Sequence, residues 1–361
     1  MSSTDPYAVL AERLNYPGST RLDAILKYWL TPQQARICEA LPGTPQDVSE
    51  KIELDEGVIR QDLEDLFVRG VVFPRGDYGH REYFRFARTE MQFHDASEAT
   101  DAADIVKHRQ FFELWRDFVD NEMGPKLAAH HAAATTSRGR VVPAYKSIKD
   151  LPGVLPYEDY RELVKAQRRV AVVRCSCRIR TTALEDHCEH CAEEERWNCL
   201  QFGRSADYSM ARGAGKDLSA DEALALIDRI EDDGLIHVWR NSSSTEGVTT
   251  SCNCCSDCCI DMVPLSRAGV PIEKIWAKSR YTAFMESIEA CDGCQDCVPR
   301  CQFDAIEMAK VPGFKKLKAV IEEDKCYGCG ACVVGCKPGA LKMKTIRPVE
   351  HIPVLTGVSA E

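Results

Sequence analysis

The sequence lacks both a long apolar run and a nucleotide-binding glycine motif. Nowhere in its 361 residues do about 18 apolar residues follow one another, so we expect no membrane insertion. The opening residues, MSSTDPYAVLAERLNYPG, hold no basic stretch followed by an apolar run, which predicts a cytoplasmic protein without a secretory signal. Neither G-x-G-x-x-G at a strand-to-helix turn nor G-x-x-x-x-G-K-S/T is present, so we expect any nicotinamide, flavin or nucleotide chemistry to belong to a partner.

The sequence also has fewer basic than acidic residues. The 46 Lys and Arg residues are outnumbered by 56 Asp and Glu residues, which gives a formal net charge of −10. A nucleic-acid binder needs a positive surface to displace counterions from phosphates. The charge balance therefore disfavours nucleic acid as a partner.

Cysteine, by contrast, is abundant and unevenly spread. Of the 19 cysteines, Cys38 stands alone, ten lie between Cys175 and Cys259, and eight lie between Cys291 and Cys336. A chain of this length can bury a core without disulfide staples, and bunched C-x-x-C spacing favours metal binding in a reducing compartment. Because Cys38 sits in the apolar helical run ARICEAL, we expect it to be a buried packing residue.

Residues 1–99 predict helices followed by a β-hairpin. Residues 20–40 place apolar side chains at helical intervals, and Thr44 and Asp55 begin two more capped stretches. In residues 71–86, β-prone side chains flank the turn-rich PRGDYG. The result, helices with a β-wing, resembles a winged helix.

A winged helix suggests DNA binding, but the predicted recognition helix is acidic, and a phosphate backbone would repel it. Its acidic residues are Asp55, Glu56, Asp62, Glu64 and Asp65, against Arg60 and Arg69. We therefore favour a protein-docking or regulatory module. Arginines on or near the wing keep the DNA interpretation open, and these are Arg75, Arg81, Arg85 and Arg88.

The whole chain predicts an α+β, multidomain architecture. After the winged-helix-like domain, residues 100–150 form a helical connector, with a long helix over 101–134 that bends near Gly124. Residues 151–285 form a central, mixed α/β, cysteine-rich domain with strands over 170–174 and 235–241, a helix over 218–234 and a loop over 203–216. Residues 286–348 form a C-terminal module, and residues 349–361 form a tail.

The C-terminal module contains one cysteine pattern twice. Each copy follows C-x-x-C-x-x-C-x-x-x-C, and the second begins 35 residues after the first. Three thiols at three-residue intervals can wrap one face of a cubane while the fourth points away, which favours iron–sulfur clusters over paired zinc knuckles.

The stretch from residue 286 to 345 resembles bacterial two-cluster ferredoxins. The resemblance implies two [4Fe–4S] clusters, each with three ligands from one copy and the fourth from the other. The implied ligand sets are Cys291, Cys294, Cys297 and Cys336 for one cluster, and Cys326, Cys329, Cys332 and Cys301 for the other. The proline that usually follows the fourth cysteine is replaced by Gln302 and Lys337, which we expect to shift the cluster potentials without abolishing ligation.

The insert between the two copies, residues 309–325, predicts a hairpin that bears Lys315, Lys316 and Lys318. We interpret these lysines as a solvated strand face. A docking patch for an acidic partner is the alternative.

The central domain holds a second group of thiols, and we predict that they bind metal. These are Cys175, Cys177, Cys188, Cys191, Cys199, Cys252, Cys254, Cys255, Cys258 and Cys259. We expect the blocks to meet in space and to hold a third iron–sulfur cluster or zinc. Arg174, Arg178 and Arg180 would favour thiolates at the first pair. A redox-active vicinal dithiol is a further alternative. The region is loosely similar to uncharacterised iron–sulfur proteins of anaerobic bacteria, and this likeness implies no residue role.

Together these features predict an iron–sulfur electron-transfer protein, or a subunit of a larger oxidoreductase, rather than a stand-alone enzyme. Its expected partners are redox proteins that carry flavin, nicotinamide or another cofactor. Two alternatives stay open. One is a cluster-dependent redox sensor that acts through the winged helix, and the other is an oxidoreductase with its substrate at the central cluster. The sequence assigns no catalytic residue.

Overall fold

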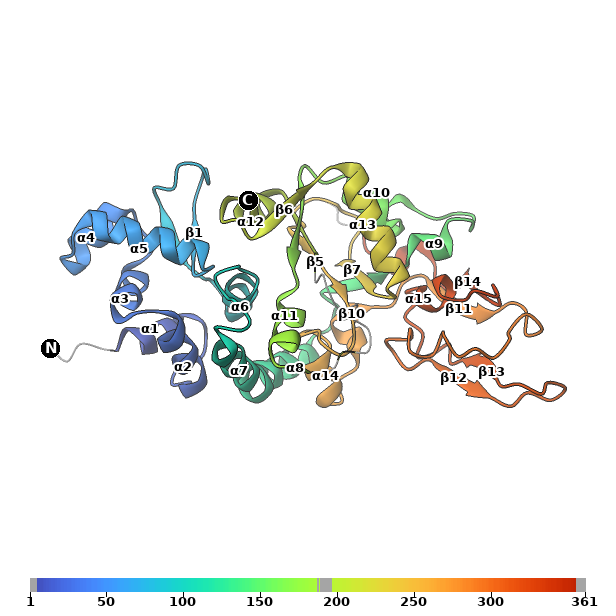
Figure 1. The fold of residues 1–361 in the computed structure, drawn as a ribbon. Coiled ribbons are helices and arrows are strands. Elements are labelled where there is room, and N and C mark those ends of the chain that lie inside the picture. Colours follow the sequence, from blue (N-terminus) through green and yellow to red (C-terminus); the bar gives the residue numbers. More distant parts are fainter. Residues whose placement is uncertain (1–4, 187, 189–196, 355–361) are drawn as a thin grey trace. The chain divides into compact units, whose positions relative to one another are not determined.

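The computed structural model describes residues 5–186, 188 and 197–354, drawn in Figure 1. The chain forms two compact units. The first consists of residues 1–124, 173–187 and 204–216, and the second of residues 125–172, 188–203 and 217–361. The prediction of a mixed chain with helices and several sheets is confirmed.

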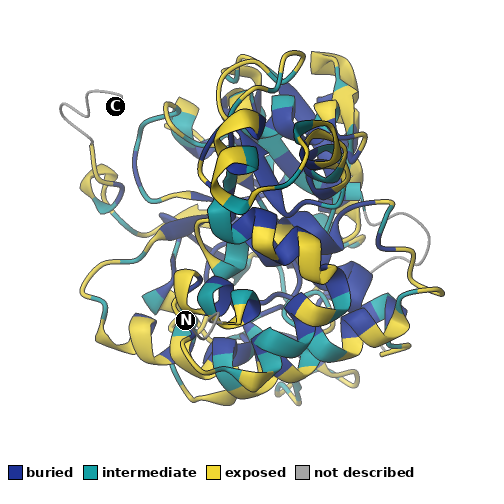
Figure 2. Ribbon diagram, turned by 90° about the vertical axis from the view of Figure 1, so that its left-hand side faces the viewer, coloured by how far each residue is buried: buried dark blue, intermediate teal, exposed yellow. Residues whose placement is uncertain are grey.

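The first unit begins with five helices and a hairpin. The helices are α1 (Pro6–Arg13), α2 (Thr20–Trp29), α3 (Pro32–Ala40), α4 (Pro45–Ile52) and α5 (Glu56–Val68), and the antiparallel strands are β1 (Val72–Pro74) and β2 (Phe84–Phe86). Thr31 and Thr44 each form a capping box, with proline at the next position, so these two starts are fixed locally. Helix ribbons that alternate between buried and exposed residues are visible in Figure 2. The helices from residue 20 onward and the hairpin match those expected, whereas α1 was not predicted. Winged-helix membership and the docking or regulatory role stay predictions.

Two expectations for the following helices need correction. The helix predicted over 101–134 begins only at Arg109, as α7 (Arg109–Phe118), and continues through a π-helical turn, η1 (Val119–Met123), into α8 (Gly124–Ala133). The loop predicted over 203–216 is wrong, because it contains α12 (Gly203–Ala211) and the start of β6 (Gly215–Leu218). The Tyr208 ring of α12 stacks on Phe73 with centroids 4.7 Å apart, so tertiary packing overrides the glycine-rich local sequence. The unit also contains α6 (Glu90–Glu98) and α11 (Ser176–Ala183).

The second unit contains a four-stranded sheet in the order β10-β3-β7-β9. Its strands are β3 (Gly139–Val142), β7 (Ile236–Arg240), β9 (Asn253–Cys254) and β10 (Trp276–Ala277). A second sheet has the order β6-β4-β5-β8, with β4 (Val170–Arg174), β5 (Trp197–Phe202) and β8 (Thr250–Ser251). The short helices are α9 (Tyr145–Ile148), α10 (Tyr160–Lys165) and α14 (Val263–Arg267), and α13 (Ala220–Asp232) is the capped helix predicted over 218–234.

The C-terminal module and the five residues that precede it contain two antiparallel strand pairs and a short helix. The pairs are β11 (Tyr281–Met285) with β14 (Leu341–Thr345), and β12 (Ile306–Ala309) with β13 (Lys318–Ile321), and the helix is α15 (Ala331–Val334). The predicted hairpin between the cysteine copies is confirmed by the β12–β13 pair. One detail of that prediction is wrong. Lys318 is buried rather than solvated, because its ammonium group donates to the carbonyl of Cys291 and lies over the Phe314 ring.

Candidate metal centres

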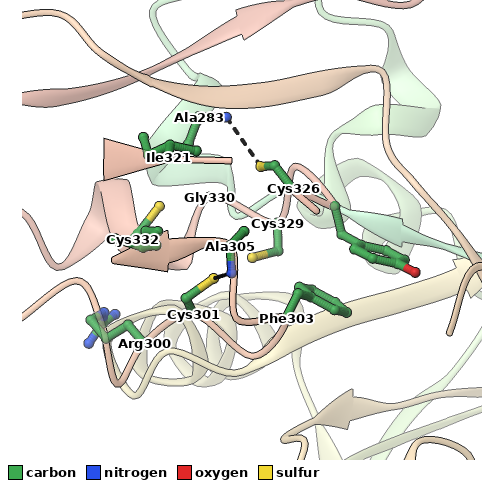
Figure 3. A pocket seen from close by; sticks show the side chains of 12 residues that line it. Ala283, Arg300, Cys301, Phe303, Ala305, Ile321, Cys326, Cys329, Gly330 and Cys332 are labelled. Carbon is green, nitrogen blue, oxygen red and sulfur yellow. Dashed lines mark hydrogen bonds between the residues drawn. The ribbon is translucent and has the colours of Figure 1, made fainter. Parts of the chain in front are cut away.

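The first candidate centre is a cavity that four predicted ligands line together, Cys301, Cys326, Cys329 and Cys332. Figure 3 shows these side chains grouped around one space, with Phe303 beside them. Backbone N–H groups point at two of the sulfurs: Ala305 donates to Cys301 at 3.2 Å and Ala283 donates to Cys326 at 3.5 Å. Such donors stabilise a negatively charged thiolate and tune a bound metal.

The second candidate centre is a cavity lined by the other four ferredoxin-type cysteines, Cys291, Cys294, Cys297 and Cys336. Met285, Met308 and Leu341 line its apolar part. Asp292 and Asp296 also line it, and Cys294 is the exposed member of the set. The structure thus places each fourth cysteine with the three from the other copy, which is the grouping that the ferredoxin resemblance implies. The ligand sets themselves stay predictions.

Glycines in the two copies allow the loops to close around these cavities. Gly293 and Gly328 occupy matching positions and have positive φ angles of +75° and +68°. A Cβ atom on Gly293 would lie 2.7 Å from the carbonyl oxygen of Leu317, and one on Gly328 would lie 2.2 Å from that of Tyr281. Any larger residue would therefore meet both backbone strain and a clash at each position.

The donor sets fit clusters better than single ions. Burial raises the pKa of Cys297 to about 11 and that of Cys332 well above its ordinary value, so the free thiols are protonated and metal binding must release protons. In a cubane each thiolate binds a different iron, which keeps the sulfurs further apart than around one ion. Within the described residues, none of the ferredoxin-type cysteines belongs to a group of three ligand atoms that all lie within 4.8 Å of one another.

Such a close group does occur in the central domain. The sulfurs of Cys188, Cys255 and Cys258 all lie within 4.8 Å of one another, and those of Cys188 and Cys255 are 3.8 Å apart. A tetrahedral ion with Zn–S bonds of about 2.3 Å holds its sulfurs ~3.8 Å apart. The prediction that cysteines from separate central blocks come together is therefore confirmed for these three. Their spacing suits one metal ion.

The other central cysteines have different surroundings. Cys254 and Cys259 are buried with their sulfurs 3.5 Å apart, and hydrogen bonds with Cys252 and Cys259, together with burial, raise the pKa of Cys254 well above its ordinary value. The Cys199 sulfur accepts from the Gln201 side chain at 3.7 Å. Cys191 lies outside the described residues.

The first central pair lies in the first unit. Cys175 precedes the first residue of α11, and Cys177 is buried in the first turn of that helix. We expected Arg180 to stabilise the thiolate forms of Cys175 and Cys177. Arg180 also pairs with the Glu98 carboxylate, a contact that the sequence did not predict. Its Nη1 lies 3.5 Å from Oε2 of Glu98, and both side chains are buried. Metal binding by Cys175 and Cys177 stays a prediction.

Gln302 gives a structural reason for the missing ferredoxin proline. Its side chain is 5% exposed, and its Oε1 accepts from Ser256 N at 2.7 Å and from Ser256 Oγ at 3.0 Å. Its Nε2 donates to the Gly234 carbonyl at 3.3 Å. Proline could make none of these bonds. The residue that departs from the pattern therefore connects the ferredoxin-type module to the central cysteine loop, residues 252–259.

Replacement of Gln302 by leucine should destabilise the protein without removing the clusters. The substitution leaves buried polar groups without partners, at a cost of about 1–3 kcal/mol in the free energy of unfolding. Lys337→Leu is the matched control, because Lys337 occupies the same position in the other copy and is exposed. We expect the control to stay within about 0.5 kcal/mol of the wild type in denaturant titrations. Equal effects of the two variants would contradict the assigned role of Gln302.

Comparison with known families identifies one match. Residues 290–340 match the family described as 4Fe-4S dicluster domain. Comparison with curated proteins finds no match, and comparison with solved structures finds none either. The match supports the binding of [4Fe–4S] clusters by the C-terminal module. In the described part of the chain, no helix has the length and apolar character that crossing a bilayer requires.

Proposed function

We propose that this protein is an iron–sulfur electron-transfer protein or subunit, which passes single electrons through two [4Fe–4S] clusters in its C-terminal module. In this proposal Cys301, Cys326, Cys329 and Cys332 hold one cluster, and Cys291, Cys294, Cys297 and Cys336 hold the other. A central metal ion, most simply zinc, is held by Cys188, Cys255 and Cys258. The clusters supply one-electron chemistry, and the chain positions them and limits their contact with solvent.

One observation carries the proposal. The eight cysteines form two separate thiol-lined cavities, and one cavity is in apolar contact with the central cysteine loop. Phe303 and Tyr327 line that cavity and stack on each other with ring centroids 4.0 Å apart. Tyr327 belongs to the same packed apolar cluster as Cys254 and Cys259, and Cys329 packs against that cluster. This arrangement packs the ligands of one cavity directly against the central cysteine loop.

The other cavity suits exchange with an external partner. Its ligand Cys294 is exposed, so a cluster held there would lie near the surface. Asp292 and Asp296 flank it, so the partner's surface at this point is expected to be basic rather than acidic. We propose that this partner is a redox protein that carries flavin, nicotinamide or another cofactor.

The test is the metal content of anaerobically purified protein. We expect about eight iron atoms and a matching amount of acid-labile sulfide per chain, with two interacting EPR signals after reduction. About one zinc should accompany them, and Cys258→Ser should remove this zinc while the iron stays unchanged. Cys38→Ser, at a buried cysteine remote in sequence from both motifs, is the control. Absence of iron from intact protein would refute the proposed function. About twelve irons per chain would indicate that the central site holds a third cluster instead of zinc.

A further inference from the structure

The central cysteine loop points its thiols in two different directions. The inner pair, Cys255 and Cys258, meets Cys188 in the group of three that suits a metal ion. The outer pair, Cys254 and Cys259, has its sulfurs 3.5 Å apart, and Cys252 contacts Cys254. The sequence neighbours Cys254 and Cys255 therefore belong to different groups, and so do Cys258 and Cys259.

Among the described residues, the outer pair does not belong to a close group of three ligand atoms. Cys252 contacts Cys254, but Cys252, Cys254 and Cys259 do not form a group whose sulfurs all lie within 4.8 Å of one another. Cys254 and Cys259 are 8% and 6% exposed, respectively, and they lie among apolar side chains such as Ile236, Val238 and Met262. Two sulfurs at this separation need only a small approach to form a covalent bond of about 2.05 Å.

We propose that Cys254 and Cys259 are a redox-active pair that switches between dithiol and disulfide and exchanges electrons with the clusters of the C-terminal module. This inference rests on the proposed function, because the clusters are its electron acceptors and donors. It differs from a vicinal disulfide within Cys254–Cys255 or Cys258–Cys259, which would close a strained ring.

The reaction balances with the groups that the proposal names. On oxidation, the two S–H bonds break, one S–S bond forms, and two protons and two electrons leave the pair. The two [4Fe–4S] clusters that the C-terminal module would hold could take up these two electrons, one each. In the reverse direction, the same clusters would supply two electrons, and the two sulfurs would take up two protons. The pair would therefore convert between two-electron chemistry and the one-electron steps of the clusters.

The position of the pair fits this role. Cys254 and Cys259 share an apolar cluster with Tyr327, and Cys329 and Phe303 pack against it. Gln302 binds Ser256, which lies within the same loop, so movement of the loop away from the module would break two hydrogen bonds. A metal ion bound by Cys188, Cys255 and Cys258 would hold the other cysteines of the loop. Both anchors keep the pair close to one cavity in either redox state.

The test uses full-length protein, purified without oxygen and with its iron and zinc measured in the same sample. The protein is reduced, oxidised stepwise with a mediator, quenched with a thiol alkylating reagent and mapped by mass spectrometry. We expect a disulfide that joins Cys254 to Cys259 to appear on oxidation and to vanish on reduction. Reductive titration should consume about two more electrons per chain in the wild type than in Cys254→Ser or Cys259→Ser, because one disulfide takes two electrons. Cys38→Ser should match the wild type.

Each result has a defined meaning. With about eight irons present, failure to find the disulfide, or a disulfide between other cysteines, overturns the inference and leaves the proposed function intact. Loss of the central metal in Cys254→Ser or Cys259→Ser also overturns it, because the two residues would then be metal ligands. Absence of iron from the wild type refutes the proposed function, and the inference fails with it. The mapping of the wild type needs no variant, so misfolding of a variant cannot hide the answer.

Discussion

Cys301→Ala will remove the same cluster as Cys329→Ala, although the two cysteines belong to different copies of the motif. In the sequence, Cys301 follows Cys291, Cys294 and Cys297, but it lines the cavity of the second copy, as the ferredoxin resemblance implies. We therefore expect either variant to lower the iron content from about eight to about four per chain. The EPR spectrum of the reduced protein should change from an interacting pair to one isolated cluster.

The reciprocal variants complete this test. Cys291→Ala and Cys336→Ala should each leave the other cluster, so their spectra should match each other and differ from those of the first two variants. Double variants distinguish the grouping most sharply. Cys301→Ala with Cys329→Ala should keep about four irons, whereas Cys301→Ala with Cys297→Ala should lose nearly all. The opposite result would show that each copy of the motif supplies all four ligands of its own cluster.

Arg180→Met is expected to cost about 2–3 kcal/mol in the free energy of unfolding, because it removes one of the two cationic groups, Arg180 and His94, that lie beside the buried Glu98 carboxylate. Glu98 is fully buried, and its Oε2 lies 3.5 Å from Arg180 Nη1 and 3.1 Å from His94 Nε2. Arg180 also contacts the His94 ring directly. Denaturant titration of the anaerobic protein measures the loss.

An exposed ion pair in the same unit provides the matched control. Arg109 pairs with Glu113 at 3.1 Å, but both side chains are about half exposed, at 46% and 55%. Solvent screens such pairs, so Arg109→Met should stay within about 1 kcal/mol of the wild type. The double variant Arg180→Met with Glu98→Gln should recover part of the loss, since it removes both charges of the Arg180–Glu98 pair. Equal losses for Arg180→Met and Arg109→Met would show that the buried pair contributes no more to the free energy of unfolding than the exposed pair does.

Local signals explain why the helix starts were predictable. The capping boxes at Thr31 and Thr44 use contacts between residues three positions apart, and each is followed by proline. Such signals do not depend on the rest of the fold. By contrast, the helix at residues 203–211 has few local signals, and the Tyr208 ring packs against Phe67 and Phe73, which are distant in the sequence.

The sequence by itself determined the nature of the C-terminal site, because ligand spacing in a ferredoxin-type motif is a local property of about ten residues. It also predicts metal binding by the central thiols, but not how these thiols are grouped in space. That division depends on contacts such as that between Cys188 and Cys255, which are 67 residues apart. The burial of Lys318 and the bonds of Gln302 to Ser256, 46 residues away, likewise come from tertiary packing alone. No spacing rule encodes such contacts, because folding decides which side chains meet only after the strands and helices have packed together.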